Sequence, residues 1–220
     1  MTAPSAGHKP SAEEAVLEWF QRNARSVAVA VVVIAAGAGA YWFYNRSVDI
    51  KNQNAEQALN TALQSVQSGN KALATSDLQK VVTRYGDTQS GIEAGLLMAQ
   101  LDFNDQKVPE GVTLLEGLTR SGAAKLQLAS IYSLIGDGQM QGGQFAAAAK
   151  SYQQAVDASG SDLDKSYQLS KQARALALSG NTAAAVVIWK KLASDPKAQG
   201  IGAEARVRLG EAEAKAATKS

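Results

Sequence analysis

The chain has 220 residues, with 22 Lys and Arg against 20 Asp and Glu, no cysteine and one histidine. This near balance of charge does not favour a nucleic-acid-binding face. The absence of cysteine excludes disulfides, Fe–S clusters and cysteine nucleophiles. With His8 as its only histidine, the chain also lacks the residues of a histidine-based zinc site and of a Ser-His-Asp triad.

Residues 1–25 precede the first long apolar stretch. Their apolar side chains group apart from three glutamates and Arg22, which is typical of a helix lying at a membrane surface. We therefore predict a cytoplasmic leader with a short interfacial helix. The apolar side chains of this helix are Val16, Leu17, Trp19 and Phe20.

Residues 26–45 carry no charge and lie between Arg25 and Arg46. A helix of this length spans about 30 Å, the thickness of the hydrocarbon core of a bilayer. Aromatic side chains gather at both ends, as they do at the boundary between lipid and water. We predict a single-pass transmembrane helix over 26–45, with membrane-interface anchors at Trp19, Phe20, Tyr41, Trp42 and Tyr44.

Two other interpretations of this stretch are a buried core helix and a cleaved signal peptide. A buried core helix seldom runs to this length without a charge and with basic residues at both ends. A signal peptide has a short basic segment before its apolar stretch, whereas here 25 residues with three glutamates precede it. The pattern Ala38-Gly39-Ala40 nevertheless fits a cleavage site. Basic residues near the stretch slightly favour a cytoplasmic N-terminus, which would place residues 46–220 on the opposite side of the membrane.

Residues 46–220 are helical in character, and a pattern recurs along them. A turn residue is followed by a small residue and then by large ones, as in tetratricopeptide repeats, where the small residue lets two helices approach closely. The turns lie at Gly69, Asp105, Gly143 and Gly180. We predict an all-α helix-pair solenoid of about four pairs and a closing helix.

The four copies differ in quality. The best two place Ala148 with Tyr152, and Ala185 with Trp189, after their turns. In the copy at Asp105, the position of the small residue falls on Glu110, with Leu114 after it. A generic helical bundle with chance matches is the alternative, because alanine-rich sequences produce such matches.

The sequence predicts no catalytic, cofactor-binding or metal-binding residue. The pair Asp162 and Asp164 resembles the start of a calcium loop, but the later ligand positions are wrong. Instead we predict a partner-binding concave face, lined by the first helix of each pair. Its side chains would be Asp102, Ser130, Ser133, Asp137, Met140, Tyr167, Ser170 and Arg174.

In its order of segments the chain resembles the YfgM-like proteins of bacterial inner membranes. The residues that carry this resemblance are Glu18-Trp19-Phe20, the span Ser26–Tyr44 with its aromatic end, and the helix Ala55–Gly69. The resemblance implies a cytoplasmic N-terminus, periplasmic repeats and an ancillary role beside the protein-export translocon and periplasmic chaperones.

The sequence therefore predicts a membrane-anchored interaction scaffold and not an enzyme. Its partners would be subunits of a membrane complex, exported polypeptides or chaperones, with no cofactor, nucleic acid or small-molecule substrate. The alternative is a structural accessory subunit of another inner-membrane complex, respiratory or photosynthetic. In that case the small residues near Gly37 and Gly39 would permit close helix contact.

Overall fold

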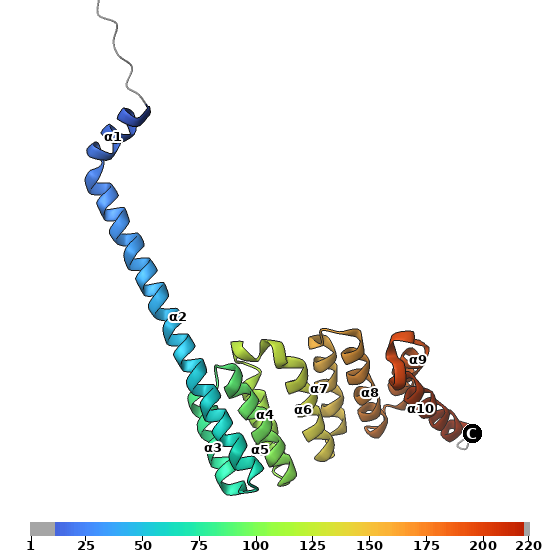
Figure 1. The fold of residues 1–220 in the computed structure, drawn as a ribbon. Coiled ribbons are helices and arrows are strands. Elements are labelled where there is room, and N and C mark those ends of the chain that lie inside the picture. Colours follow the sequence, from blue (N-terminus) through green and yellow to red (C-terminus); the bar gives the residue numbers. More distant parts are fainter. Residues whose placement is uncertain (1–11, 218–220) are drawn as a thin grey trace, which may run out of the picture. The chain divides into compact units, whose positions relative to one another are not determined.

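The computed structural model describes residues 12–217, so residues 1–11 of the predicted leader lie outside the described part. Every regular element in that part is helical (Figure 1). The contacts divide the chain into two units, Met1–Ile50 and Lys51–Ser220, and each is described here by itself. The prediction of an all-α chain is confirmed for the described residues.

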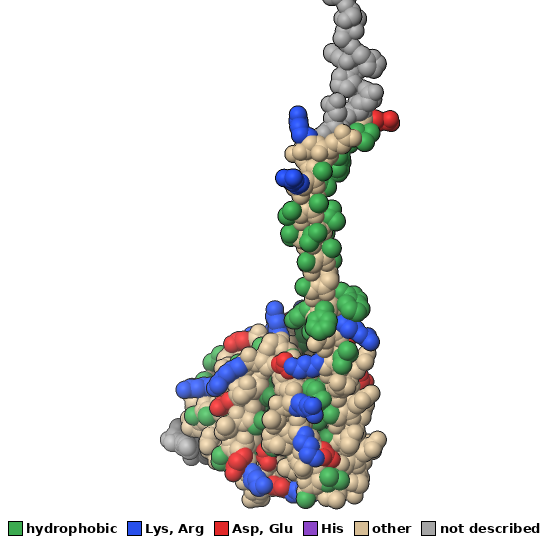
Figure 2. Space-filling model, turned by 90° about the vertical axis from the view of Figure 1, so that its left-hand side faces the viewer, with side chains coloured by type: hydrophobic (Ala, Val, Ile, Leu, Met, Phe, Trp, Pro, Cys, Tyr) green, Lys and Arg blue, Asp and Glu red, His purple; other side chains and the backbone are tan. Residues whose placement is uncertain are grey.

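The first unit holds helix α1, Ala12–Arg22, and the beginning of helix α2, Ala24–Gln67. The most apolar window of α2 has no residue buried within the protein, and Figure 2 shows apolar side chains exposed along this unit. By length and composition alone, α2 is able to cross a membrane, but a signal sequence near the N-terminus passes the same test. The membrane span therefore stays a prediction.

The second unit is an array of antiparallel helix pairs. Residues 51–67 of α2 pack against α3, and α10 follows the last pair (Figure 1). Two short 3-10 helices, η1 and η2, precede α6 and α10. The bounds are α3 Lys71–Tyr85, α4 Gln89–Asn104, α5 Val108–Leu118, η1 Gly122–Gln127, α6 Leu128–Gln141, α7 Phe145–Ala158, α8 Asp162–Leu178, α9 Thr182–Ser194, η2 Pro196–Ala198 and α10 Gln199–Ala217.

The turns within the pairs share one backbone geometry. Gly69, Gly143 and Gly180 have φ values of 71°, 71° and 89°, in the left-handed region that glycine enters without strain. At each of the last two turns, the next residue donates its N–H to a carbonyl in the last turn of the helix before, at 2.8 Å and 2.9 Å. These are the helix-ending bonds of a Schellman motif, so the three glycines mark equivalent positions.

The fourth equivalent position is Gln106, which corrects the register predicted for the second pair. Gln106 has φ 63°, and Lys107 donates to the carbonyl of Asp102 at 2.8 Å, as in the glycine turns. The anchors 69, 106, 143 and 180 are therefore each 37 residues apart. The prediction that Asp105 anchors this repeat was wrong by one residue.

The corrected register also corrects the packing predicted for α5. The small residue five positions after the anchor is the buried Gly111, and Glu110 is exposed. A Cβ at Gly111 would come within 2.5 Å of the Phe103 ring, so the glycine permits close approach of α4 and α5. The equivalent buried residues of the other repeats are Ala74, Ala148 and Ala185.

Large buried side chains follow four positions later and fill the space between the helices of a pair. They are Leu78, Leu115, Tyr152 and Trp189. Tyr152 packs against Gly136 of α6, where a Cβ would lie 2.5 Å from the ring. Each pair thus buries its apolar face on its own partner helix and on the next pair, as expected for a solenoid.

Replacing Gln106 by glycine is expected to stabilise the repeats by about 0.5–1 kcal/mol, because glycine adopts the left-handed conformation without the strain of a Cβ. Gly143→Ala is the matched reverse change, since nothing lies within 4 Å of the added Cβ and only backbone strain is introduced. It should destabilise by a similar amount. Urea unfolding followed by circular dichroism measures both; a destabilising Gln106→Gly would contradict the assigned turn.

Ion pairs join several of the neighbouring segments of the array. Lys51 lies 2.6 Å from Asp87, and Lys197 lies 2.7 Å from Asp162. Lys71 pairs with Asp105 in the same way. All of these groups except Asp105 are largely exposed, so water and salt screen each pair and its contribution to stability is small. Apolar burial between the pairs therefore dominates the stability of the array.

Candidate binding groove of the repeats

Three hollows with volumes of about 530, 310 and 400 Å³ share Arg174 of α8. The first two also share Ser170 and Glu204, and the first and third share Lys171. Because they share these lining residues, we treat the three hollows as one groove. Its remaining lining residues are Asp137, Met140, Gln141, Phe145, Tyr152, Leu163, Tyr167, Ala177, Leu178, Trp189, Ala198, Gly200, Ile201, Arg208 and Glu211.

Lys171 joins α8 to α6 and α7 within the groove. Its Nζ lies 2.7 Å from an Asp137 carboxylate oxygen and donates to the Ser133 hydroxyl at 2.9 Å. It also lies 5.3 Å from the ring centroids of both Tyr152 and Tyr167, within the range of a cation–π interaction. These contacts hold the ammonium group in one place, so the wall of the groove is preorganised.

The Tyr152 hydroxyl completes this cluster, donating to the second oxygen of Asp137 at 2.6 Å. Burial raises the pKa of the Tyr152 phenol, and the hydrogen bond to Asp137 raises the pKa further. The phenol therefore keeps its proton throughout the physiological range and acts as a donor. Asp137 thus accepts hydrogen bonds from both Tyr152 and Lys171. It thereby links α7 of the third helix pair to α8, the first helix of the fourth pair.

Arg174 differs from Lys171 because its guanidinium makes no hydrogen bond or ion pair with the side chains of residues 12–217 that the structure places. The residue is exposed and lines all three hollows. By contrast, Arg208 contacts both Glu204 and Glu211. Arg174 thus presents five N–H donors to whatever occupies the groove.

The structure brings together five of the eight residues predicted for the concave face. Asp137 and Met140 of α6 line the groove with Tyr167, Ser170 and Arg174 of α8. Their role in partner binding remains a prediction. The remaining three are Asp102, Ser130 and Ser133.

Those three lie elsewhere or are covered. Ser133 is buried and holds Lys171, so it supports the groove from behind instead of lining it. Ser130 is exposed on α6 but lines none of the three hollows. Asp102 lines a separate hollow of about 460 Å³ with residues of α3, α4 and α5.

The sequence reasoning missed Lys171, Glu204 and Arg208. Lys171 follows Tyr167 by four residues and so lies on the helix face already selected through Tyr167 and Arg174. That spacing was sufficient to find it. The two residues of α10 had no such signal, because the concave face was assigned only to first helices and α10 was taken as a closing helix.

Asp102 is expected to make the stability of the repeats depend on pH. Burial raises the pKa of its carboxyl above the ordinary 3.8, while Lys107 lowers the pKa and Glu110 raises it. The folded chain therefore keeps this proton at a higher pH than the unfolded chain does. The ionised carboxylate consequently lowers the free energy of unfolding near pH 7. This destabilisation disappears as the pH falls through the raised pKa.

Asp102→Asn should therefore increase the free energy of unfolding near pH 7 relative to the unchanged chain. The gain should shrink as the pH approaches 3.8, where the unchanged chain is also protonated. Urea unfolding of both proteins near pH 7 and near pH 4 measures the difference. An equal gain at both pH values would show that the carboxylate charge is not its cause.

The groove combines apolar and charged side chains. Apolar side chains from α6, α7, α8 and α10 alternate with charged groups, and no cluster of three potential metal ligands occurs among the described residues. The predicted interface anchors belong to the first unit, on α1 and α2, and line none of the three hollows. Trp19, Phe20, Tyr41, Trp42 and Tyr44 are all exposed there, and their role at a membrane stays a prediction.

Residues 17–134 match the family described as tetratricopeptide repeat-like domain, and this match covers more than half of the chain. The chain belongs to this family. The prediction of a tetratricopeptide-like solenoid is thereby confirmed, and the match indicates no enzymatic family. No curated protein matches the sequence.

Solved structures show the same tetratricopeptide-like fold. One is of a protein from Podosopora anserina named as a kinesin light chain with nearly identical TPR-like repeats, with a TM-score of 0.52 and 17% identity. A second structure, of a point variant of that protein, gives a TM-score of 0.53 and 17% identity. Each match covers 72% of this chain and 89% of the other. At this identity the likeness concerns the fold alone.

Proposed function

We propose that this protein is a membrane-anchored interaction scaffold whose groove binds extended segments of other polypeptides. The groove carries the proposal, because three hollows meet at an arginine that has no partner among the placed side chains of the chain. Tetratricopeptide repeat-like domains are typical protein-interaction modules, which supports the same function.

The chemistry of the groove favours a polypeptide over a small molecule. Apolar side chains such as Leu163, Ile201 and Leu178 accept side chains of the partner, and Arg174 donates to its carbonyl or carboxylate oxygens. The three hollows together extend over α6, α7, α8 and α10. A ligand that is long and has repeated acceptors fits such a surface, and an extended peptide has both properties.

We further propose that α2 anchors these repeats in a bacterial inner membrane, with the N-terminus in the cytoplasm. The family match begins at residue 17 and so includes the apolar part of α2. The resemblance to YfgM-like proteins supports a place beside the protein-export translocon. Exported polypeptides and periplasmic chaperones would then be the partners that reach the groove.

A photo-crosslinking amino acid at Ser170 tests the groove in intact cells. Ser170 is half-buried and lines two of the hollows, so a crosslinker there reaches the bound chain. We expect crosslinks from Ser170 to other polypeptides and few from the control position Lys190, which is exposed on α9. Equal crosslinking at both positions, or none at Ser170, would overturn the proposed groove.

Affinity purification in mild detergent tests the proposed setting. We expect translocon subunits or periplasmic chaperones to be recovered with the full chain, and their consistent absence would overturn this assignment. The alternative is a structural subunit of a respiratory or photosynthetic complex. It is supported by Gly37 and Gly39, which have nothing within 4 Å and would permit close helix contact. Recovery with such a complex at fixed stoichiometry would favour it.

A further inference from the structure

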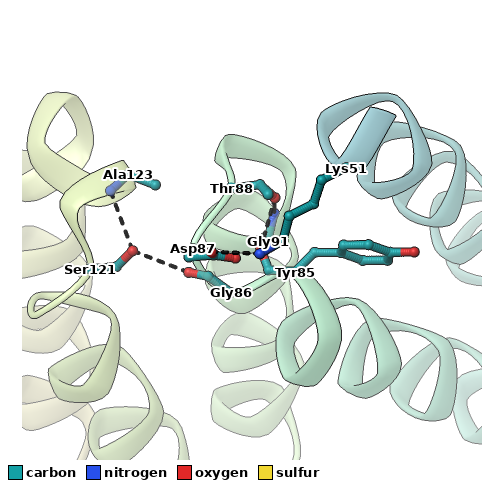
Figure 3. A network of polar contacts seen from close by, with 8 residues as sticks. All are labelled: Lys51, Tyr85, Gly86, Asp87, Thr88, Gly91, Ser121 and Ala123. Carbon is teal, nitrogen blue, oxygen red and sulfur yellow. Dashed lines mark hydrogen bonds and ion pairs between the residues drawn. The ribbon is translucent and has the colours of Figure 1, made fainter. Parts of the chain in front are cut away.

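One edge of the second unit is formed by turns that bind one another (Figure 3). Lys51 of α2 pairs at 2.6 Å with Asp87, in the turn between α3 and α4. In the same turn, the carbonyl of Gly86 accepts a hydrogen bond of 3.2 Å from the Ser121 hydroxyl. Ser121 begins η1, accepting from the N–H of Ala123 at 3.3 Å. We call these turns, residues 86–88 and 119–127 with Lys51, the tethered rim.

The tethered rim displays a leucine that the fold does not cover. Leu126 of η1 is 92% exposed, more than any other large apolar side chain of the second unit. Its neighbour Ala124 is completely buried in the core, so η1 is held in place while Leu126 points outward. A leucine held in water by a fixed element is less favourable than a buried one, because its apolar surface stays hydrated. The position therefore suits a surface that covers it.

The charge around Leu126 is positive. Arg120 and Lys125 precede it in the chain and are both exposed, and residues 119–127 contain no acidic residue. The one carboxylate of the neighbouring turn, Asp87, is paired with Lys51, which holds the pKa of that carboxyl below its ordinary value. Because Asp87 is neutralised in this way, the free charge of the rim is that of its cations. An exposed apolar side chain in a segment whose free charges are cations matches an anionic lipid surface.

Chain length keeps this rim near the predicted span, whatever the orientation of the repeats. Lys51 follows Asn45, the last residue of the predicted span, by six residues. Six residues cover at most about 20 Å even when fully extended. The turn at Gly69, at the other end of the second unit's part of α2, lies a further ~27 Å along that helix. Lys51 of the tethered rim therefore lies within about 20 Å of the end of the predicted span.

From these observations we propose that the tethered rim docks on the lipid surface of the membrane that holds α2, with Leu126 inserted between headgroups and with Arg120 and Lys125 on anionic lipids. The proposal rests on the proposed membrane anchor. It adds a second, reversible contact that would restrict the orientation of the groove above the bilayer. A protein partner or a second copy of the chain on the rim would be a different outcome.

Single labels test this docking directly, because the chain has no native cysteine. The full chain would carry an environment-sensitive fluorophore on Leu126→Cys. It would be studied at one molecule per nanodisc, in discs that contain anionic lipid and no other membrane protein. We expect a blue-shifted emission that lipid-borne quenchers suppress. Leu73→Cys is the control, since this leucine is 45% exposed beside the turn at Gly69 and should report water. Equal emission from both positions in the nanodisc would overturn the docking.

A label on Ile34→Cys separates the docking from the anchor, because Ile34 lies within the predicted span. A lipid signal at Ile34 without one at Leu126 overturns the docking and leaves the proposed function standing. No lipid signal at Ile34 means that the anchor itself is wrong. The signal at Leu126→Cys could also appear only when native membrane proteins or a second chain are present in the disc. That result would overturn the proposal, because the rim would then contact a protein instead of lipid.

Reversing the charge of the two cations gives a second measurement, made with the same fluorophore on Leu126→Cys. Arg120→Glu with Lys125→Glu should reduce the lipid-bound population of the rim at least about fivefold per cation removed, and purely zwitterionic nanodiscs should act in the same direction. Lys190→Glu with Lys191→Glu is the matched control on α9, where both lysines are exposed. An equal effect of the two double variants would contradict a specific contact.

Discussion

Tyr152→Ala is expected to lower the free energy of unfolding of the repeats by about 3–5 kcal/mol, as is usual when a buried aromatic residue is truncated. Tyr152 is only 2% exposed, and its ring packs against the backbone of Gly136. The facing residue, Gly136, has no side chain that could fill the space. The variant would therefore have a cavity between α6 and α7.

Tyr152→Phe distinguishes packing from polar contacts at this position. It keeps the ring but removes the hydrogen bond to Asp137, whose side chain is 41% exposed and still paired with Lys171. We expect a loss of only about 1 kcal/mol, since water can replace the phenol. Urea unfolding of both variants by circular dichroism measures the two losses. Equal losses would mean that the cluster around Asp137, not the ring, stabilises this pair.

The effect of Tyr152→Ala should also be local. Each helix pair of a solenoid contacts only its neighbours, so hydrogen exchange should rise most in α6, α7 and α8. Helix α3, which belongs to the pair beyond the neighbouring one, should keep more of its protection. Uniform loss of protection across the second unit would instead show that the array unfolds as one cooperative block.

The fold could be predicted well from the sequence because its signal is local and repeated. Gly143 and Gly180 mark turns that need a positive φ, and Ala148 and Ala185 follow at the spacing that close helix contact requires. These constraints act within about a dozen residues. The sequence therefore indicates them without knowledge of distant contacts.

The second repeat was misplaced by one residue because its left-handed position holds a glutamine. Without the glycine that usually marks this conformation, Asp105 was the more plausible turn residue. The backbone of Gln106 and the burial of Gly111 reveal the register. A search for a constant spacing of 37 residues from the three glycines would have found it.

The candidate groove was harder to predict because it depends on distances between helices. The face of α8 followed from helical spacing, but the contact of Lys171 with Asp137 joins residues that are 34 positions apart. The covering of Ser133 by that lysine has the same origin. Whether a polar residue on an inward face is open or covered depends on long neighbouring side chains, which helical periodicity does not report.

Arg174→Glu is expected to reduce the crosslinking yield from Ser170 about tenfold or more. Arginine is a donor only, and peptide carbonyls and carboxylates accept from it. A hydrogen bond that involves a charged group contributes about 1.5–3 kcal/mol, and about 1.4 kcal/mol corresponds to a tenfold change in affinity. A glutamate at this position would meet the same oxygens with repulsion. The measurement is the yield in intact cells with the crosslinker at Ser170.

Lys190→Glu is the matched control for this reversal, because it makes the same change of charge on α9 outside the groove. Its crosslinking yield should equal that of the unchanged protein. Arg174 is exposed and has no partner among the placed side chains, so its replacement should leave the unfolding midpoint nearly unchanged. A large fall in stability would mean that lost folding explains the lower yield. An unchanged yield in a stable variant would instead show that the guanidinium does not contact the bound polypeptide.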